Sequence, residues 1–245
     1  MSKLYDIYFS GAFGDKTKVG QDYVLNCHYI ADTYYSALDG YKPFKTTRIG
    51  IFLSNEKLWG GKPFFTGSIV ALPCVFDFSK YLECPKALQQ KYLLDLMHQT
   101  IIEYCTELKW DKLIFENAYK YVLDNNLEYI KQFPVKVNRD KQNKAQIIIR
   151  KNINETLTFL NINNKELLFF KSQNRFCLDP IPKLVSKNKW LDKSSFGISA
   201  ELGEMNFFYS LDKKSFDYQI IAKRVDQSVL EKKYKFIIEQ IIASH

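Results

Sequence analysis

The chain has 245 residues, 46% of them hydrophobic and 25% charged, and this balance excludes an intrinsically disordered protein. Its longest apolar stretch, near Ser68–Phe76, falls far short of the ~20 residues that a membrane-spanning helix needs. The net charge of +8 is uneven, because residues 1–130 hold 14 Lys and Arg against 15 Asp and Glu, whereas residues 131–245 hold 21 against 12. The basic second part is consistent with an acidic partner or with solubility alone.

The first ten residues, MSKLYDIYFS, lack the apolar core of a signal peptide, so we expect a cytoplasmic protein without a membrane partner. The cysteines are odd in number and contain no CxxC pair, which disfavours a disulfide framework and a structural zinc site. We therefore expect reduced, mostly buried thiols, no metal and no cofactor. The five positions are Cys27, Cys74, Cys84, Cys105 and Cys177.

The first part of the chain predicts strands and helices in succession. Residues 4–10 have the character of a strand, and residues 20–38 carry apolar side chains at helical spacing. Residues 46–55 and 64–78 are rich in β-branched and aromatic residues, which predicts two strands joined by a turn.

The strongest helical pattern lies at residues 86–108, and a second helix is predicted at about 111–130. Apolar residues in the first helix recur at steps of three and four, which is typical of a helix packed on one face. Asp111 follows a short corner and is suited to cap the second helix. The apolar residues that recur along the first helix, residues 86–108, are Leu93, Met97, Ile101, Tyr104 and Leu108.

After Pro134 the pattern changes to short strands. Residues 135–152 predict two strands around a charged turn, and residues 155–173 predict a hairpin that turns at Asn163-Asn164. Further strands are expected in residues 195–212 and 216–224, and residues 226–243 predict a closing amphipathic helix.

Because strands and helices are segregated, the sequence predicts an α+β fold with mainly antiparallel sheet, a central helix pair and a C-terminal helix. We expect a single domain over residues 1–245, with one candidate sub-boundary near residues 133–146.

The most enzyme-like motif is SGAFGDKT, Ser10–Thr17, which follows the first predicted strand. A phosphate-binding loop needs G-x-x-x-x-G-K-[ST], so that backbone amides surround the phosphates while the lysine reaches their oxygens. Gly11 stands one residue too close to Lys16, and Asp15 replaces the final glycine with a carboxylate that would repel phosphate. We interpret the segment as a turn.

Other catalytic patterns are equally incomplete. Cys27 and His28 are adjacent and point to different faces, and His98 and Cys105 are two helical turns apart, beyond hydrogen-bond reach. We therefore interpret His98 as a packed residue. These absences lead us to expect a protein that is not an enzyme. The most favourable carboxylate–lysine set for a metal-dependent nuclease is Asp179, Asp212 and Lys214, and it lacks the expected motif.

What remains is surface recognition. Aromatic residues beside glycine and proline turns are the type that anchors protein interfaces, although they also close the ends of sheet cores. A dense basic run from Lys131 to Lys151 suits an acidic partner. The predicted partner-binding residues are Phe13, Tyr41, Trp59, Phe64, Arg139 and Lys141.

Residues 76–126 contain FDF, a long helix, the corner Trp110-Asp111 and a second helix. This layout resembles that of small bacterial α+β proteins encoded beside toxins. The whole chain is similar in size and style to the immunity proteins of polymorphic or contact-dependent toxin systems. The resemblance covers roughly a fifth of the sequence and carries over no functional residue. Immunity proteins against nucleases are frequently acidic, and the basic second part departs from that.

The resemblance implies a cytoplasmic binding protein that neutralises a toxin, or another protein partner, by occluding its active site. The alternative is a protein that binds or processes nucleic acid with its basic second part.

Overall fold

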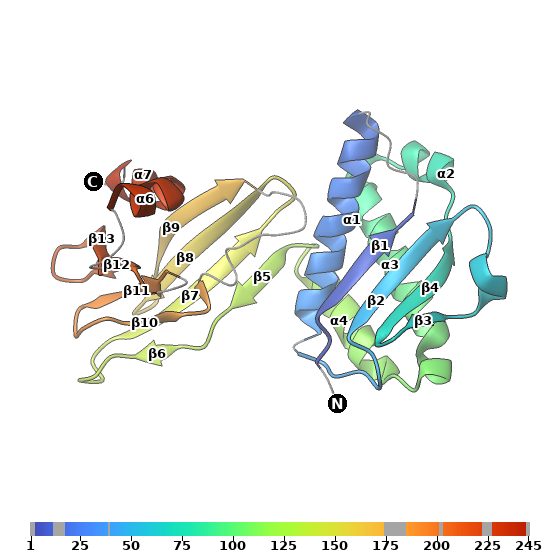
Figure 1. Cartoon of the computed structure of the whole chain (residues 1–245), viewed down its shortest axis with the longest axis horizontal. Coiled ribbons are helices and arrows are strands. Elements are labelled where there is room, and N and C mark those ends of the chain that lie inside the picture. The colour runs from blue at the N-terminus through green and yellow to red at the C-terminus, as the bar shows by residue number, and fades with distance from the viewer. Residues whose placement is uncertain are drawn as a thin grey trace. The chain divides into compact units, whose positions relative to one another are not determined.

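The computed structural model of the chain describes residues 3–11, 18–38, 40–173, 185–200, 203–221 and 227–243. The chain divides into two compact units, residues 1–129 and 130–245, which are described separately (Figure 1). The division falls just ahead of the candidate sub-boundary at residues 133–146.

The first unit combines one sheet with helices. Its elements are β1 (Asp6–Ser10), α1 (Lys18–Ala37), β2 (Arg48–Ser54), the 3-10 helix η1 (Leu58–Gly61), β3 (Phe64–Thr66), β4 (Ile69–Val75), α2 (Phe78–Glu83), α3 (Lys86–Leu108) and α4 (Lys112–Asp124).

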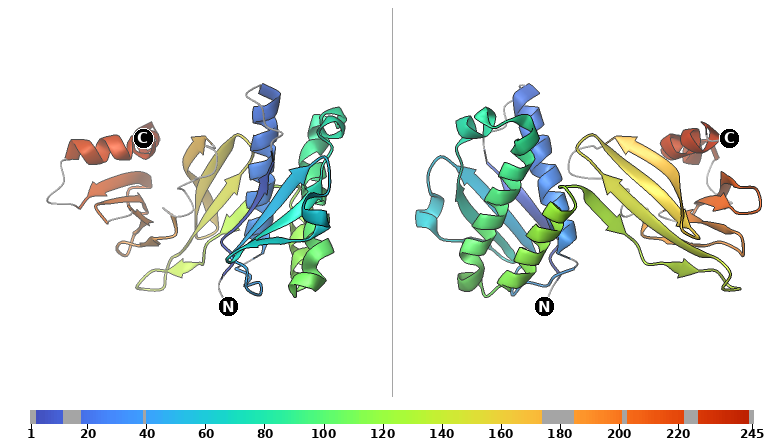
Figure 2. Two further views of the ribbon diagram at one scale, coloured as in Figure 1. Left: turned by 45° about the vertical axis from the view of Figure 1, so that its right-hand side comes forward. Right: turned by 180° about the vertical axis from the view of Figure 1, so that it is seen from behind.

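The strands of this unit lie in the order β1-β2-β4-β3. The β1, β2 and β4 strands run parallel, with Ile7 opposite Ile49 and Ile49 opposite Val70, and β3 joins β4 in an antiparallel hairpin. Helices α1, α3 and α4 lie behind the sheet, on one of its faces (Figure 2). The apolar core of the unit lies between this helical layer and the sheet.

The strand expected at residues 64–78 is in fact two strands. Gly67 adopts φ +59°, a left-handed conformation that suits glycine, and it turns β3 back onto β4. As a result β4 runs parallel to β2, so the sheet is mixed.

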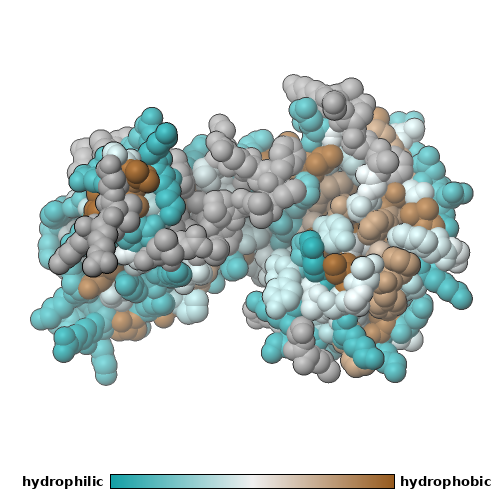
Figure 3. Space-filling view, viewed as in Figure 1, coloured by the Kyte–Doolittle hydropathy of each residue, from teal (hydrophilic) through white to brown (hydrophobic). Residues whose placement is uncertain are grey.

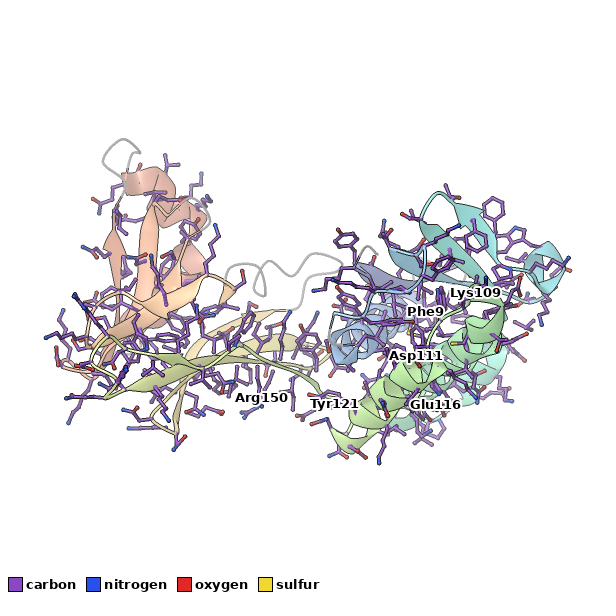
Figure 4. All side chains as sticks on the ribbon, turned by 90° about the horizontal axis from the view of Figure 1, so that it is seen from below. Phe9, Lys109, Asp111, Glu116, Tyr121 and Arg150 are labelled. Carbon is purple, nitrogen blue, oxygen red and sulfur yellow. The ribbon has the colours of Figure 1, made fainter. Side chains whose placement is uncertain are left out.

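The central helix pair is confirmed. Helix α3 has the predicted bounds, and the Asp111 Oδ1 atom accepts a 3.0 Å bond from the backbone N–H of Leu113 at the start of α4. Asp111 lies at one end of that helix in Figure 4. Helix α4 ends at Asp124 rather than near residue 130, because Asn126 and Leu127 take left-handed φ values of 52° and 62°.

The second unit is built mainly from strands. Its elements are β5 (Tyr129–Gln132, which begins at the division), β6 (Lys136–Val137), β7 (Lys144–Lys151), β8 (Glu155–Ile162), β9 (Lys165–Gln173), β10 (Asn188–Trp190), β11 (Ser195–Ser199), β12 (Met205–Ser210), β13 (Ser215–Ile220), α6 (Gln227–Lys233) and α7 (Lys235–Ala243).

These strands form two sheets, β5-β7-β8-β9 with β6 beside β7, and β10-β11-β12-β13. The hairpin turn at Asn163-Asn164 is confirmed, with φ values of 51° and 68°. The closing helix is divided at Tyr234, whose hydroxyl contacts the Glu204 Oε1 atom at 3.1 Å. Taken together, the elements form an α+β fold with mostly antiparallel sheet.

A glycine in β11 permits the close approach of β12. A Cβ atom at Gly197 would lie 1.9 Å from the Phe207 carbonyl oxygen and 2.5 Å from the Phe208 Cα atom. These are backbone atoms, so the conflict cannot be relieved by rotating a side chain.

We predict that Gly197→Ala destabilises the second unit by about 3 kcal/mol or more, because β12 must move away from β11. Hydrogen exchange of the β11 and β12 amides measures this directly. The control is Gly203→Ala, at φ 73° but with no atom within 4 Å, which should cost only about 1 kcal/mol. The prediction would be contradicted if the β11 and β12 amides exchanged equally slowly in Gly197→Ala and in Gly203→Ala.

Candidate functional site: an aromatic face on the first sheet

The two faces of the first sheet differ because side chains alternate along each strand. Ile7, Ile49 and Val70 are at most 1% exposed and face the helices. Tyr8 and Phe52 project from the opposite face, which carries no α-helix among the described residues. In Figure 3, brown and white residues run over this part of the first unit.

Three aromatic rings on this open face, those of Phe52, Trp59 and Phe64, form a continuous cluster. Trp59, from η1, lies 5.4 Å from the ring of Phe52 and stacks on Phe64 at 5.5 Å. Trp59 is 41% exposed and Phe64 is 52% exposed, so both rings present broad surfaces to solvent. We refer to Tyr8, Phe52, Trp59 and Phe64 as the aromatic face.

Gly50 allows two of these rings to lie across the sheet. A Cβ atom at Gly50 would come within 2.9 Å of Phe52 and 2.8 Å of the Tyr8 ring. The Arg48 guanidinium lies 5.2 Å from the centre of the Tyr8 ring and pairs with Asp6 at 2.7 Å. The aromatic face therefore ends at a charged rim over β1.

Trp59 reaches the face through a strained turn. Its φ of 52° is unusual for a bulky side chain, and Gly60 and Gly61 continue the left-handed stretch. The Tyr104 hydroxyl, on α3, donates a 2.9 Å bond to the Gly61 carbonyl and holds the turn from one side. Packing therefore keeps an exposed tryptophan in a costly backbone conformation.

A cavity of about 230 Å³ lies between the edge of β4 and helix α3. Pro73 and Val75 of β4 form one wall, and the ion pair between Lys57 and Glu103, 2.9 Å long, lies on the other side. The remaining wall residues are Cys74, Leu96, Gln99 and Thr100. The cavity is lined by none of the four residues of the aromatic face, and only Pro73, the register partner of Phe52, connects the two.

The structure brings together two of the predicted partner-binding residues, Trp59 and Phe64, which stack on each other. Tyr41 is half-buried, packs edge-on against Phe115, and accepts a 2.8 Å bond from the backbone N–H of Asp111. It therefore supports the corner between α3 and α4. Phe13 lies outside the described residues.

Arg139 and Lys141 are exposed in the second unit, in the turn between β6 and β7. Sequence reasoning missed Tyr8, Gly50 and Phe52. The available signal was the period of two in DIYFS and RIGIFLS, which places Tyr8 and Phe52 opposite the aliphatic residues.

The cysteine and histidine candidates belong to packed surroundings. Burial raises the pKa of Cys27 to about 12 and that of Cys105 to about 11, so both remain protonated thiols at neutral pH. The four described cysteines are free, and Cys177 lies outside the described residues. His98 stacks on Tyr119 at 4.2 Å, as its interpretation as a packed residue predicts.

The His98 ring also joins a buried hydrogen-bond network. Its Nδ1 atom lies 2.9 Å from the Tyr34 hydroxyl, which donates a 3.1 Å bond to the Phe115 carbonyl. Both bonds form together when His98 Nδ1–H donates to the Tyr34 oxygen, since that hydroxyl carries a single proton. Burial lowers the pKa of His98 below its ordinary value of 6.5, although Glu116 and Asp95 oppose the shift.

Comparison with known proteins yields no match among protein families, curated proteins or solved structures. Within the described residues, no group of three His, Cys, Asp or Glu side chains is placed to hold a metal ion. In the same part of the chain, no helix has the length and apolar character to cross a membrane. The aromatic face is therefore the strongest candidate site on geometry alone.

We predict that Trp59→Gly unfolds at a higher temperature than Trp59→Ala. Both variants lose the same ring contacts, but glycine adopts φ near 52° without the penalty of about 1 kcal/mol that alanine retains. Thermal unfolding of the two proteins at one pH measures the difference. A more stable alanine variant, as expected at an ordinary position, would contradict the strained geometry.

Stability should fall as the pH drops through about 6.5. Because the native pKa of His98 is lowered, the unfolded chain binds the proton first, and protonation in this window favours unfolding. Thermal midpoints between about pH 7.5 and about pH 5.5 measure the slope. The slope should flatten in His98→Gln, and an unchanged slope would assign the effect to another group.

Proposed function

We propose that the chain binds a partner protein through the aromatic face. The observation that carries the proposal is the stacked pair of Trp59 and Phe64, exposed on a sheet face that no described α-helix covers. Tryptophan and tyrosine are enriched among the residues that dominate binding energy, and a charged rim is typical of protein interfaces. The strain at Trp59 supports the same conclusion, because folding alone gives no reason to expose this side chain at a cost.

The mode of binding follows from the strand edges. Partners often add a strand to an open sheet, but β3 is three residues long and follows Pro63. Pro73 lacks an N–H and lies in the part of β4 that β3 leaves unpaired. Both prolines disfavour strand addition. At this edge of the sheet, the partner would therefore contact side chains rather than the backbone, and its apolar groups would pack across the rings.

The resemblance to immunity proteins supports a more specific proposal, in which the partner is a toxin and binding blocks its active site. Residues 76–126, which carry the resemblance, form α2, α3 and α4, in the same unit as the aromatic face. In this proposal the first unit, whose charge is nearly balanced, makes the apolar contact, and rim charges such as Arg48 influence orientation and association rate.

The test uses the purified product of the neighbouring gene and titration calorimetry. We predict that Trp59→Gly combined with Phe64→Ser weakens binding at least tenfold, because the central anchors are lost. Gly50→Val should also weaken binding, since its methyl groups displace Tyr8 and Phe52. The matched control is Leu113→Ser on α4, a residue that is 60% exposed.

Affinities that are equal in all variants would contradict the proposed face. The toxin proposal has a separate readout, in which expression of the native chain, but not of the Trp59/Phe64 variant, protects cells that produce the neighbouring gene product. Binding without protection would retain the interface and reject the immunity role.

A further inference from the structure

Hydrogen bonds join three turns at one end of the second unit. In the turn between β6 and β7, the Asn138 side chain donates a 2.8 Å bond to the carbonyl of Lys193, in the turn between β10 and β11. The Ser194 hydroxyl in that second turn donates a 2.6 Å bond to Asp212, in the turn between β12 and β13. Figure 1 shows these turns at the same end of the unit.

A fourth turn, between β8 and β9, joins the group. The Asn163 side chain donates a 2.7 Å bond to Asn143 and accepts a 2.9 Å bond from the backbone N–H of Lys144. Residues as far apart in sequence as 138 and 214 are therefore held in one assembly of hairpin ends. We refer to this assembly as the basic end.

Six cations project from the basic end, and all are exposed. Within the described part of the chain, none of them forms an ion pair. They are Arg139, Lys141, Lys144, Lys165, Lys193 and Lys214.

Two carboxylates at the same end accept hydrogen bonds from backbone N–H groups of their own turns. Asp140 accepts a 3.1 Å bond from the backbone N–H of Gln142. Asp192 accepts bonds of 2.8 and 2.7 Å from the backbone N–H groups of Ser194 and Ser195. These hydrogen bonds fix the carboxylates at the turns but leave their charge. Because six cations at this end exceed its three turn aspartates, Asp140, Asp192 and Asp212, a ligand would meet a net positive charge.

The basic end differs from the linear basic run in the sequence. Arg150, which belongs to that run, makes a bidentate pair with Glu166 at 2.6 and 2.9 Å and lies 4.8 Å from the Phe159 ring centre. Figure 4 shows it along the β7 strand. Folding therefore neutralises this part of the run and brings in Lys193 and Lys214, which the linear pattern did not include.

The side-chain chemistry distinguishes between the available anionic partners. Lysine is depleted in protein interfaces, but its flexible point charge suits phosphates. Four described turn segments, 138–143, 163–164, 191–194 and 211–214, present no exposed large apolar side chain for insertion into a bilayer. They also present no exposed aromatic ring on which a base could stack.

We propose that the basic end binds the phosphate backbone of nucleic acid without reading its sequence. This site lies in the second unit and is independent of the partner-binding role of the aromatic face. Lysines and one arginine from four turns contact successive phosphates and displace their counterions, and no base contact is involved.

The experiment measures binding of the full chain to a fluorescent double-stranded DNA of random sequence, over a range of salt concentrations. We expect affinity to fall steeply with salt and to be unchanged for a second sequence of equal length. The variant Arg139→Gln/Lys141→Gln/Lys193→Gln should bind at least tenfold more weakly, with a salt slope reduced by about 3. Only the carbonyl of Lys193 joins the turns, so that bond is retained.

The matched control removes the same charge elsewhere, through Lys80→Gln/Lys86→Gln/Lys120→Gln on exposed lysines of the first unit. It should retain most of the affinity. If both triple variants lost the same amount of DNA affinity, the affinity would depend on net charge alone, and the proposed binding site would be wrong. Absence of DNA binding at low salt, or binding only to anionic vesicles or to polyglutamate, would overturn the choice of nucleic acid. Hydrogen exchange of β7 and β11 verifies that the variants are folded.

Discussion

The helices α1, α3 and α4 pack on a single face of the first sheet, and the rest of that unit depends on this one-sided packing. Aliphatic residues such as Ile49 and Val70 fill the covered side completely. The other side then has to be occupied by residues that tolerate water and still protect the strands. Aromatic rings meet both demands, because each covers a large area of backbone while its outer surface remains accessible.

The first and second units solve the same packing problem differently. In the second unit, strands such as β11 and β12 are buried almost throughout. Some buried polar groups there are paired, as in the 2.7 Å contact between Ser199 and Asn206, whereas the Thr158 hydroxyl, also buried, has no partner among the described residues. Among the described residues, the first unit instead has an apolar surface that no α-helix covers. A surface of this kind is costly in water unless something covers it, which is why we place the protein contact there.

Local signals in the sequence were sufficient for several elements. The apolar stripe of α3 and the Asn163-Asn164 turn depend on neighbouring residues, and both were predicted correctly. Helix α4 was predicted too long, although Asn125-Asn126 offered a local signal for its end, because asparagine tolerates the left-handed conformation. The left-handed conformation of Leu127 has no such signal. The parallel pairing of β2 and β4 was also not anticipated, since it depends on the tight turn at Gly67.

In the candidate sites, too, single residues could be selected from local sequence, but their grouping depends on contacts between distant segments. Trp59 and Phe64 were selected by composition beside a turn, but their contact with Phe52 depends on the register of strands distant in sequence. Gly50 has no distinguishing pattern, since its importance lies in the rings that cross it. Similarly, Arg139 and Lys141 were identified as charged residues, whereas their grouping with Lys193 and Lys214 requires three separate hairpins to converge.

The parallel pairing of β1 with β2 has a consequence for the order of folding. Asp6 pairs with Arg48, so a long loop must close before this contact forms. In the β7–β8 hairpin, Lys151 pairs with Thr156 across a loop of only a few residues, and its closure costs much less entropy. The hairpins of the second unit therefore have a shorter conformational search than the pairing of β1 with β2.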